Sequence, residues 1–209
     1  MLRRGGLGLS ALALLALSAC PSVSGPQPTP IRVQGSYTHP ASRLEFPEQV
    51  AGFRRGEITQ FDAQGENLGV GYDYEAADAT VAFTVYVRRP LVFEDGEPES
   101  LGRQFAVERS VIRRYHEDNA ELWSLDVEME AAGRSLPGYA AEFRYNDLFA
   151  YARHDVVSFL YLFDRDGWFV KYRITYAEPQ DAAASAVVAR LLATAPWGTC
   201  AGYRCSWRR

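Results

Sequence analysis

A two-residue alternation of apolar and polar side chains runs through much of this chain and is clearest at residues 80–89. Successive side chains of a β-strand point to opposite faces, so the alternation predicts a strand with one buried face. That face carries Val81, Phe83, Val85 and Val87. A single strand cannot cover such a face, so the chain must build a sheet and pack other elements against it.

Further strands are predicted from the same alternation. Residues 63–66 form the expected hairpin loop, with Gly65 in it, and the Asp-Gly pair at residues 166–167 predicts a second hairpin, because these residues accept the turn backbone. The segment 156–163 is apolar on both faces except for Ser158, which predicts a central strand. Residues 133–138 are interpreted as a turn. The other predicted strands are residues 53–62, 67–75, 122–131, 139–145, 149–154 and 168–176.

Two segments have a helical period instead, residues 98–119 and 179–195. The first begins with a proline, which a helix tolerates in its first turn because the N–H there has no partner within the helix. The second ends before Pro196. Together with the strands, these segments predict an α+β fold, with a mostly antiparallel sheet covered by two helices in a single domain.

The order of elements is three strands, a helix, several strands and a second helix. This order is loosely similar to the PsbP-like sandwich of extrinsic photosystem II proteins and their bacterial relatives. No specific motif carries the resemblance. It implies a domain that binds partners or stabilises an assembly rather than a catalyst, and such an analogy of fold does not identify a site.

The first residues have the pattern of an export signal. Arg3 and Arg4 precede an apolar run at residues 7–17, which reaches roughly 16 Å at ~1.5 Å per residue, about half of a ~30 Å hydrocarbon core. The run is too short to span a membrane. Residues 17–20, Leu-Ser-Ala-Cys, resemble the lipobox of bacterial lipoproteins. An ordinary secretory signal prefers a small residue where Leu17 stands.

The lipobox resemblance implies that residues 1–19 are a signal peptide that is removed and that Cys20 receives lipid, palmitate included. Pro21 stands where the inner-membrane retention signal of enteric bacteria has an aspartate, which favours the outer membrane, with the domain in the periplasm. The segment 20–30 carries four prolines and is predicted to be a tether of up to roughly 30 Å. We expect the domain at residues 31–195 and a tail at 196–209.

Two cysteines remain once Cys20 is acylated. Cys200 and Cys205 form an even pair outside the cytoplasm, which predicts a disulfide that pins the tail. The alternative is a redox or metal pair, but the spacing is not Cys-x-x-Cys and no histidine lies nearby in the sequence.

Composition and motifs limit the function. The formal net charge of -4 argues against nucleic acid as a partner. His39, His116 and His154 do not have metal-ligand spacing, and no motif for a nucleotide or a catalytic nucleophile occurs. We therefore predict no cofactor and no enzymatic activity.

One group of side chains is a candidate ligand surface. If the strands at residues 139–145, 149–153 and 168–176 are neighbours, their charged side chains share one outer face. Cross-strand ion pairs explain such a face without a ligand, and a platform for an anion or a glycan is the alternative. Every cationic side chain other than histidine is an arginine except Lys171, and this bias is interpreted as a property of base composition rather than as a functional signal. The group comprises Glu142, Arg144, Arg153, Lys171 and Arg173, with Phe169 beside the last two.

The sequence favours a membrane-anchored cell-envelope lipoprotein, held to the bilayer through Cys20, whose domain binds another envelope protein or supports an assembly. An apolar patch with a polar rim would mark that role. One alternative is a periplasmic hydrolase with an unrecognised carboxylate pair, whose acids would converge in one cleft with raised pKa values. The other is a glycan or small-ligand module, which exposed aromatic side chains would mark.

Overall fold

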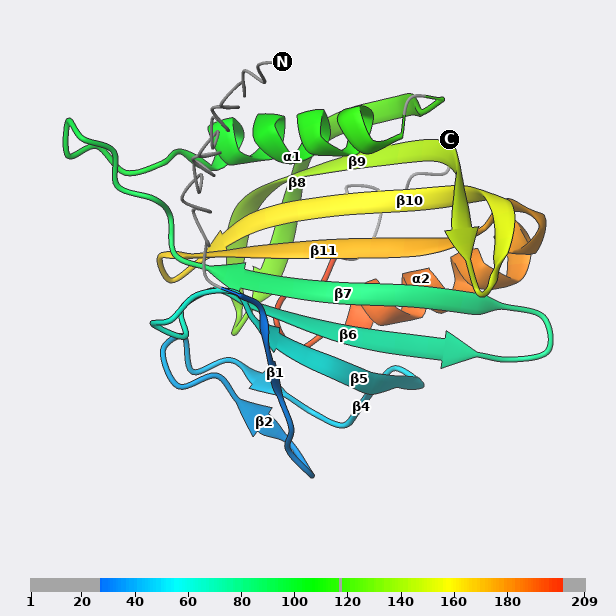
Figure 1. Ribbon diagram of the computed structural model, residues 1–209, viewed down its shortest axis with the longest axis horizontal. Helices are drawn as coiled ribbons and strands as arrows, with labels where there is room; N and C mark the ends of the chain where they lie inside the picture. The colour runs from blue at the N-terminus through cyan, green and yellow to red at the C-terminus, as the bar shows by residue number, and fades with distance from the viewer. Residues whose placement is uncertain (1–26, 117, 201–209) are drawn as a thin grey trace, which may run out of the picture.

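The computed structural model describes residues 27–116 and 118–200, which build one large antiparallel sheet and two α-helices (Figure 1). The helices are α1 (Leu101–Tyr115) and α2 (Asp181–Thr194), with the 3-10 turn η1 (Glu178–Gln180) before α2. The strands β2 (Tyr37–Thr38) and β3 (Glu45–Phe46) form a separate pair. The large sheet contains β1 (Thr29–Ile31), β4 (Gln49–Val50), β5 (Phe53–Gln60), β6 (Leu68–Glu75), β7 (Thr80–Arg88), β8 (Ala120–Ala131), β9 (Arg134–Phe149), β10 (Ala152–Arg165) and β11 (Trp168–Ala177).

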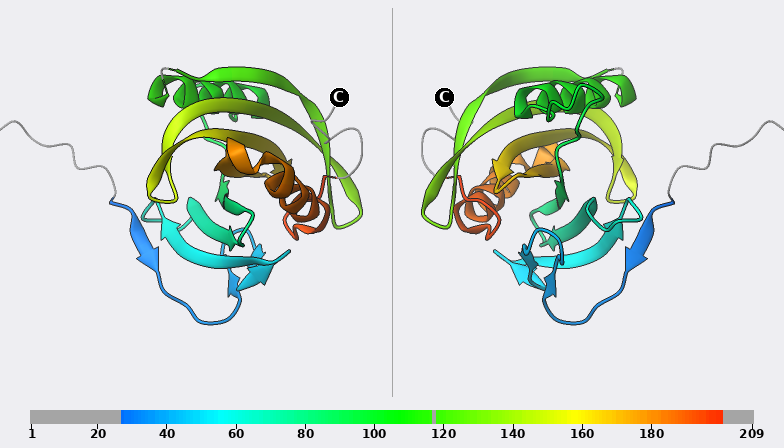
Figure 2. Two further views of the ribbon diagram at one scale, coloured as in Figure 1. Left: turned by 90° about the vertical axis from the view of Figure 1, so that its right-hand side faces the viewer. Right: turned by 90° about the vertical axis from the view of Figure 1, so that its left-hand side faces the viewer.

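The strand order is β1-β5-β6-β7-β11-β10-β9-β8, and β4 pairs with β5 off this path. Every pair is antiparallel. Figure 2 shows that the sheet curves strongly, with α2 inside the curve and α1 outside it. The predicted α+β class, with a mostly antiparallel sheet and two helices in a single domain, is confirmed.

The concave face of the sheet holds the larger core. Val81, Phe83, Val85 and Val87 point into it from β7 and pack with α2. A smaller core lies on the convex face under α1, around Phe105. The alternation of β7 therefore corresponds to a strand whose concave-face side chains are buried and whose convex-face side chains are partly exposed.

The folded domain extends past both ends of the predicted 31–195 segment. Thr29 and Pro30, which were assigned to the tether, pair with Thr59 and Gln60 of β5. Trp197, assigned to the tail, is 1% exposed, and its indole Nε1 donates to the Glu45 carbonyl oxygen at 2.7 Å. Trp197 and Cys200 are therefore part of the core, and residues 196–200 belong to the folded domain.

Two predicted boundaries around β9 and β10 are wrong. The predicted strand 149–154 contains the β9–β10 turn, where Ala150 and Tyr151 adopt positive φ angles of 48° and 68°. Neither residue is typical of such a turn, so no sequence signal marked it. The predicted turn 133–138 is mostly strand, because Gly138 lets the backbone of β10 approach closely: a Cβ there would lie 2.9 Å from the Leu162 carbonyl oxygen.

Candidate ligand-binding pocket

The predicted ligand surface divides between the two faces of the sheet, so the prediction of one shared face is wrong. β10 lies between β9 and β11, and its register with each of them determines which side chains share a face. Leu162 pairs with Lys171 on one side and Tyr139 on the other, which places Lys171 on the convex face under α1. Phe159 pairs with Glu142, which places Glu142 on the concave face.

The remaining members follow the same parity. Phe169 and Arg173 share the convex face with Lys171, as expected for alternate residues of β11. Arg144 and Arg153 have the same parity as Glu142 in the β9–β10 register and therefore lie on the concave face. The guanidinium of Arg153 lies near the end of the β9–β10 hairpin, with Nη1 3.5 Å from Asn146 Oδ1. Only two of the predicted residues, Phe169 and Lys171, line a pocket described below.

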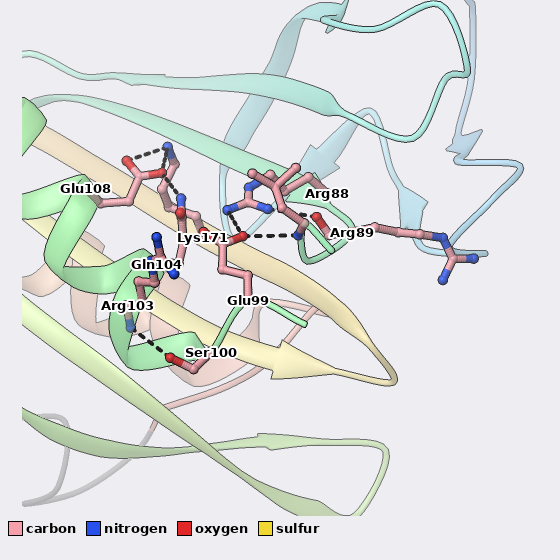
Figure 3. A network of polar contacts seen from close by, with 9 residues as sticks. Arg88, Arg89, Glu99, Ser100, Arg103, Gln104, Glu108 and Lys171 are labelled. Atoms are coloured by element: carbon pink, nitrogen blue, oxygen red, sulfur yellow. Dashed lines mark hydrogen bonds and ion pairs between the residues drawn. The ribbon is translucent and has the colours of Figure 1, made fainter. Parts of the chain in front are cut away.

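A pocket of about 240 Å³ opens between α1 and the convex face of β7 and β11. Gln104 and Glu108 reach it from α1, and Lys171 reaches it from β11 (Figure 3). The loop between β5 and β6 adds an aromatic and an amide side chain. The complete lining is Phe61, Asn67, Tyr86, Arg88, Gln104, Glu108, Leu162, Phe169 and Lys171.

An ion pair is part of the pocket lining. Lys171 Nζ donates to both carboxylate oxygens of Glu108 at 2.9 Å, and Gln104 Nε2 donates to Glu108 Oε1 at 2.7 Å. The Lys171 and Glu108 side chains are 18% and 16% exposed. Burial lowers the pKa of Lys171, while the Glu108 carboxylate acts in the opposite direction. The ammonium also lies 4.1 Å from the centroid of the Tyr86 ring, where the ring face favours a cation.

A second ion pair fixes the start of α1 beside the pocket. Arg88 Nη2 donates to Glu99 Oε2 at 2.8 Å, and the Glu99 side chain is 5% exposed. The same carboxylate oxygen accepts the Leu91 N–H at 3.2 Å. Ser100 then caps the helix by accepting the Arg103 N–H (Figure 3). The helix that supplies Gln104 and Glu108 is therefore attached to β7 through Glu99, just before its N-cap.

Phe61 and Tyr86 form an aromatic wall of the pocket. Their rings stack with centroids 6.3 Å apart and an interplanar angle of 29°. Gly69 of β6 makes room for both rings: a Cβ at this position would lie 2.9 Å from Phe61 and 3.2 Å from Tyr86. Burial raises the pKa of Tyr86.

Glu142 belongs to a separate polar cluster on the concave face. Its Oε2 accepts the Trp123 indole N–H at 2.7 Å, and its Oε1 lies 3.6 Å from Arg144 Nε. Arg144 also pairs with Glu178 of η1. Burial raises the pKa of Glu142. The nearby Asp181 accepts the Tyr176 hydroxyl at 2.7 Å, so these contacts join strands to the start of α2.

The lipid and disulfide predictions fall largely outside the described residues. Cys20 and Cys205 lie in the segments 1–26 and 201–209, so neither lipidation nor the disulfide is tested. Cys200 is 4% exposed, and its N–H donates to the Leu192 carbonyl oxygen at 2.7 Å. His39 is buried, with Nδ1 2.7 Å from Ser42 Oγ.

Neither a metal site nor a membrane span is found in the described part of the chain. Within residues 27–116 and 118–200, no group of three or more His, Cys, Asp or Glu side chains is arranged to hold a metal ion. In the same residues, no helix has both the length and the apolar character needed to cross a membrane.

Sequence reasoning missed most of the pocket. Glu108 and Gln104 lie on a helix with many charged residues, and nothing in the sequence places them opposite β11. Asn67 and Phe61 flank a predicted hairpin loop and have no motif. Lys171 is the one polar lining residue that the predicted ligand surface already contained.

No known protein family and no curated protein matches this sequence. Among solved structures, the chain is similar to the solution structure of the cyanobacterial PsbP protein, CyanoP, from Synechocystis sp. PCC 6803. The identity is 9%, and the match covers 88% of this chain and 99% of that chain with a TM-score of 0.41. The likeness agrees with the loosely PsbP-like element order, and at this TM-score it carries no argument about function.

Proposed function

We propose that this protein is a lipid-anchored component of the bacterial cell envelope whose domain binds a small ligand in the pocket between α1 and β11, without catalysing a reaction. The observation that carries the proposal is the ion pair of Lys171 and Glu108 in the lining of that pocket. The sequence favoured a domain that binds another envelope protein. The pocket leads us to prefer the alternative, a domain that binds a small ligand.

A buried ion pair is weak support for stability, because desolvation of the two charges offsets most of their attraction. An apolar pair would hold α1 on the sheet equally well. Here the pair borders a pocket that combines aromatic walls with convergent polar groups, Asn67 and Gln104 among them. That combination is typical of small-molecule sites.

The same geometry favours binding over catalysis. A lysine nucleophile must be neutral, and the Glu108 carboxylate, which contacts Nζ twice, stabilises its charged form. Two acids of the described residues have raised pKa values, Asp73 and Glu142, and neither lines the pocket. The carboxylate pair that the hydrolase alternative requires is therefore not assembled at this pocket.

The pocket can be tested through the chemistry of Lys171, because it is the only lysine. In the full chain purified in detergent, acetylation by an N-hydroxysuccinimide ester is followed at Lys171 by mass spectrometry, with a lysine peptide as internal standard. We expect the small-molecule fraction of an envelope extract to slow the modification. Asn67→Ala should weaken the protection, and the matched control Asn146→Ala, distant from the pocket, should retain it. Lack of protection by every fraction would contradict a ligand-binding role.

The anchor is tested separately. Cells are grown with an alkyne analogue of palmitate, and the label is measured on the native chain and on Cys20→Ala. We expect label and firm membrane attachment only for the native chain, because several buried acyl chains are needed for stable anchoring. Equal labelling of both forms would overturn the lipid-anchor proposal and, with it, the outer-membrane location.

A partner protein remains a second candidate, and one observation favours it. Val107, Val111 and Tyr115 are 46%, 39% and 77% exposed, and their spacing of four puts them along one face of α1. In a pull-down from gently solubilised envelopes, a partner that docks there should be lost with Val111→Glu and kept with Cys20→Ala if lipid is not required. An unchanged set of partners in the Val111→Glu variant would argue against this face.

A further inference from the structure

From the groups that line the pocket we infer that its ligand is a neutral sugar ring. This inference rests on the proposed binding function and names the chemical class of the ligand. Three properties of the pocket support it: its charges are already paired, its free polar groups include both donors and acceptors, and one wall is aromatic.

The charges of the lining are balanced by contacts within the protein. Lys171 is paired with Glu108, and Arg88 is paired with Glu99 just behind the pocket. An anionic ligand would have to compete with a carboxylate that is already in place, and the displaced carboxylate would then be buried without a partner. Desolvated charges of this kind are strongly unfavourable. A neutral ligand avoids both costs.

The polar groups of the lining that are not used in ion pairs require a ligand that both donates and accepts hydrogen bonds. Gln104 uses its Nε2 on Glu108, which leaves its carbonyl oxygen as an acceptor. The Asn67 side chain makes no hydrogen bond with the described residues, so it offers both an amide donor and a carbonyl acceptor. A hydroxyl group has one donor and two acceptor sites, and therefore matches such a mixed set. Several hydroxyls on one ring can serve these groups together.

The aromatic wall suits the remaining surface of a sugar. A pyranose presents C–H groups on its faces, and the negative face of an aromatic ring attracts their slightly positive hydrogens. Phe61 provides such a face beside Tyr86, whose own ring face contacts the Lys171 ammonium, and both rings are held in place over Gly69. The pocket volume of about 240 Å³ is below the ~300–1,000 Å³ that holds drug-sized ligands, which limits the bound part to about one ring.

The test uses methyl glycosides, because a free reducing sugar could react with the Lys171 amine. Methyl glucoside, methyl galactoside, methyl mannoside and methyl N-acetylglucosaminide are each added to the full chain in detergent, and Lys171 acetylation is measured as above. Sodium phosphate and sodium acetate serve as anionic probes. We expect at least one glycoside to slow acetylation several-fold and the anions to leave the rate unchanged.

Two aromatic variants make the test specific to the wall. Phe61→Ala should abolish protection by the glycoside, and Tyr151→Ala, a fully exposed aromatic at the β9–β10 turn, should retain it. Circular dichroism checks that both variants fold. Protection by an anion but by no glycoside would overturn the sugar assignment while the binding function stands. Protection by the envelope fraction alone would also overturn it, and no protection by any addition would contradict the binding function itself.

Discussion

Glu108→Gln tests the contribution of the ion pair in the pocket lining to stability. The substitution keeps the shape of the side chain and removes its charge, which leaves the ammonium of Lys171 without a carboxylate. Removal of one partner of a buried pair costs ~3–5 kcal/mol. Both side chains keep about a sixth of their surface exposed, 18% and 16%, so we expect a loss at or slightly below the lower limit of this range, about 2–3 kcal/mol. For a domain of this size the loss corresponds to roughly 5–10 °C in Tm.

A double-mutant cycle separates the energy of the Lys171–Glu108 interaction from the cost of changing each residue alone. Lys171→Met leaves Glu108 buried with only the Gln104 amide, and we expect a similar loss of stability. The combined variant buries no unpaired charge, so its cost should be about 1 kcal/mol rather than the sum of the single costs. Urea unfolding followed by circular dichroism, at one pH and salt concentration, gives the free energies of unfolding. Additive losses would refute the reasoning, and so would single variants within about 0.5 kcal/mol of wild type.

The pH dependence gives an independent check on the same lysine. Because burial lowers the pKa of Lys171 below 10.5, the unfolded chain binds more protons than the folded protein between the lowered pKa and 10.5. The contribution of Lys171 to stability therefore rises with pH across that window. Glu108→Gln should lower the pKa further and widen the window, and Lys171→Met should remove this dependence. An NMR titration of the reductively methylated amine measures the pKa, and a value at or above 10.5 would contradict the burial argument.

Three other regions give predictions of their own. His116 stacks on Tyr145 with ring centroids 3.8 Å apart, and burial lowers the pKa of its imidazole. The contribution of His116 to stability should therefore fall as the pH drops from 6.5 through the lowered pKa. An imidazole pKa above 6.5 by NMR would contradict this. Ala150→Asn with Tyr151→Gly should stabilise the β9–β10 turn by about 1–2 kcal/mol, since both residues have positive φ; an unchanged urea midpoint would argue against strain there. Trp197→Ala should cost about 3–5 kcal/mol, whereas a loss below about 1 kcal/mol would show that the ring is not part of the core.

Local patterns predicted most elements of the fold because they depend on neighbours in the sequence. Alternation placed β5, β6, β7 and β11 to within a few residues, and the Asp-Gly pair placed the β10–β11 turn, where Asp166 and Gly167 have positive φ. The β9–β10 turn was missed because Ala150 and Tyr151 are held in a turn backbone by the long strands on either side. Gly138 was misassigned because its role, a close approach of β10, depends on a strand far along the chain.

The sequence by itself determined the two classes of element and the single lysine, and it predicts an export signal that ends at Cys20, since each depends on adjacent residues or on composition. Only the tertiary structure decided which charged residues share a face. Because β10 lies between β9 and β11, Glu142 and Lys171 lie on opposite faces of the sheet; strand order and register determine the face on which each side chain lies. Packing of α1 against the convex face then brought Glu108 to Lys171 across a distance in sequence that no local pattern spans.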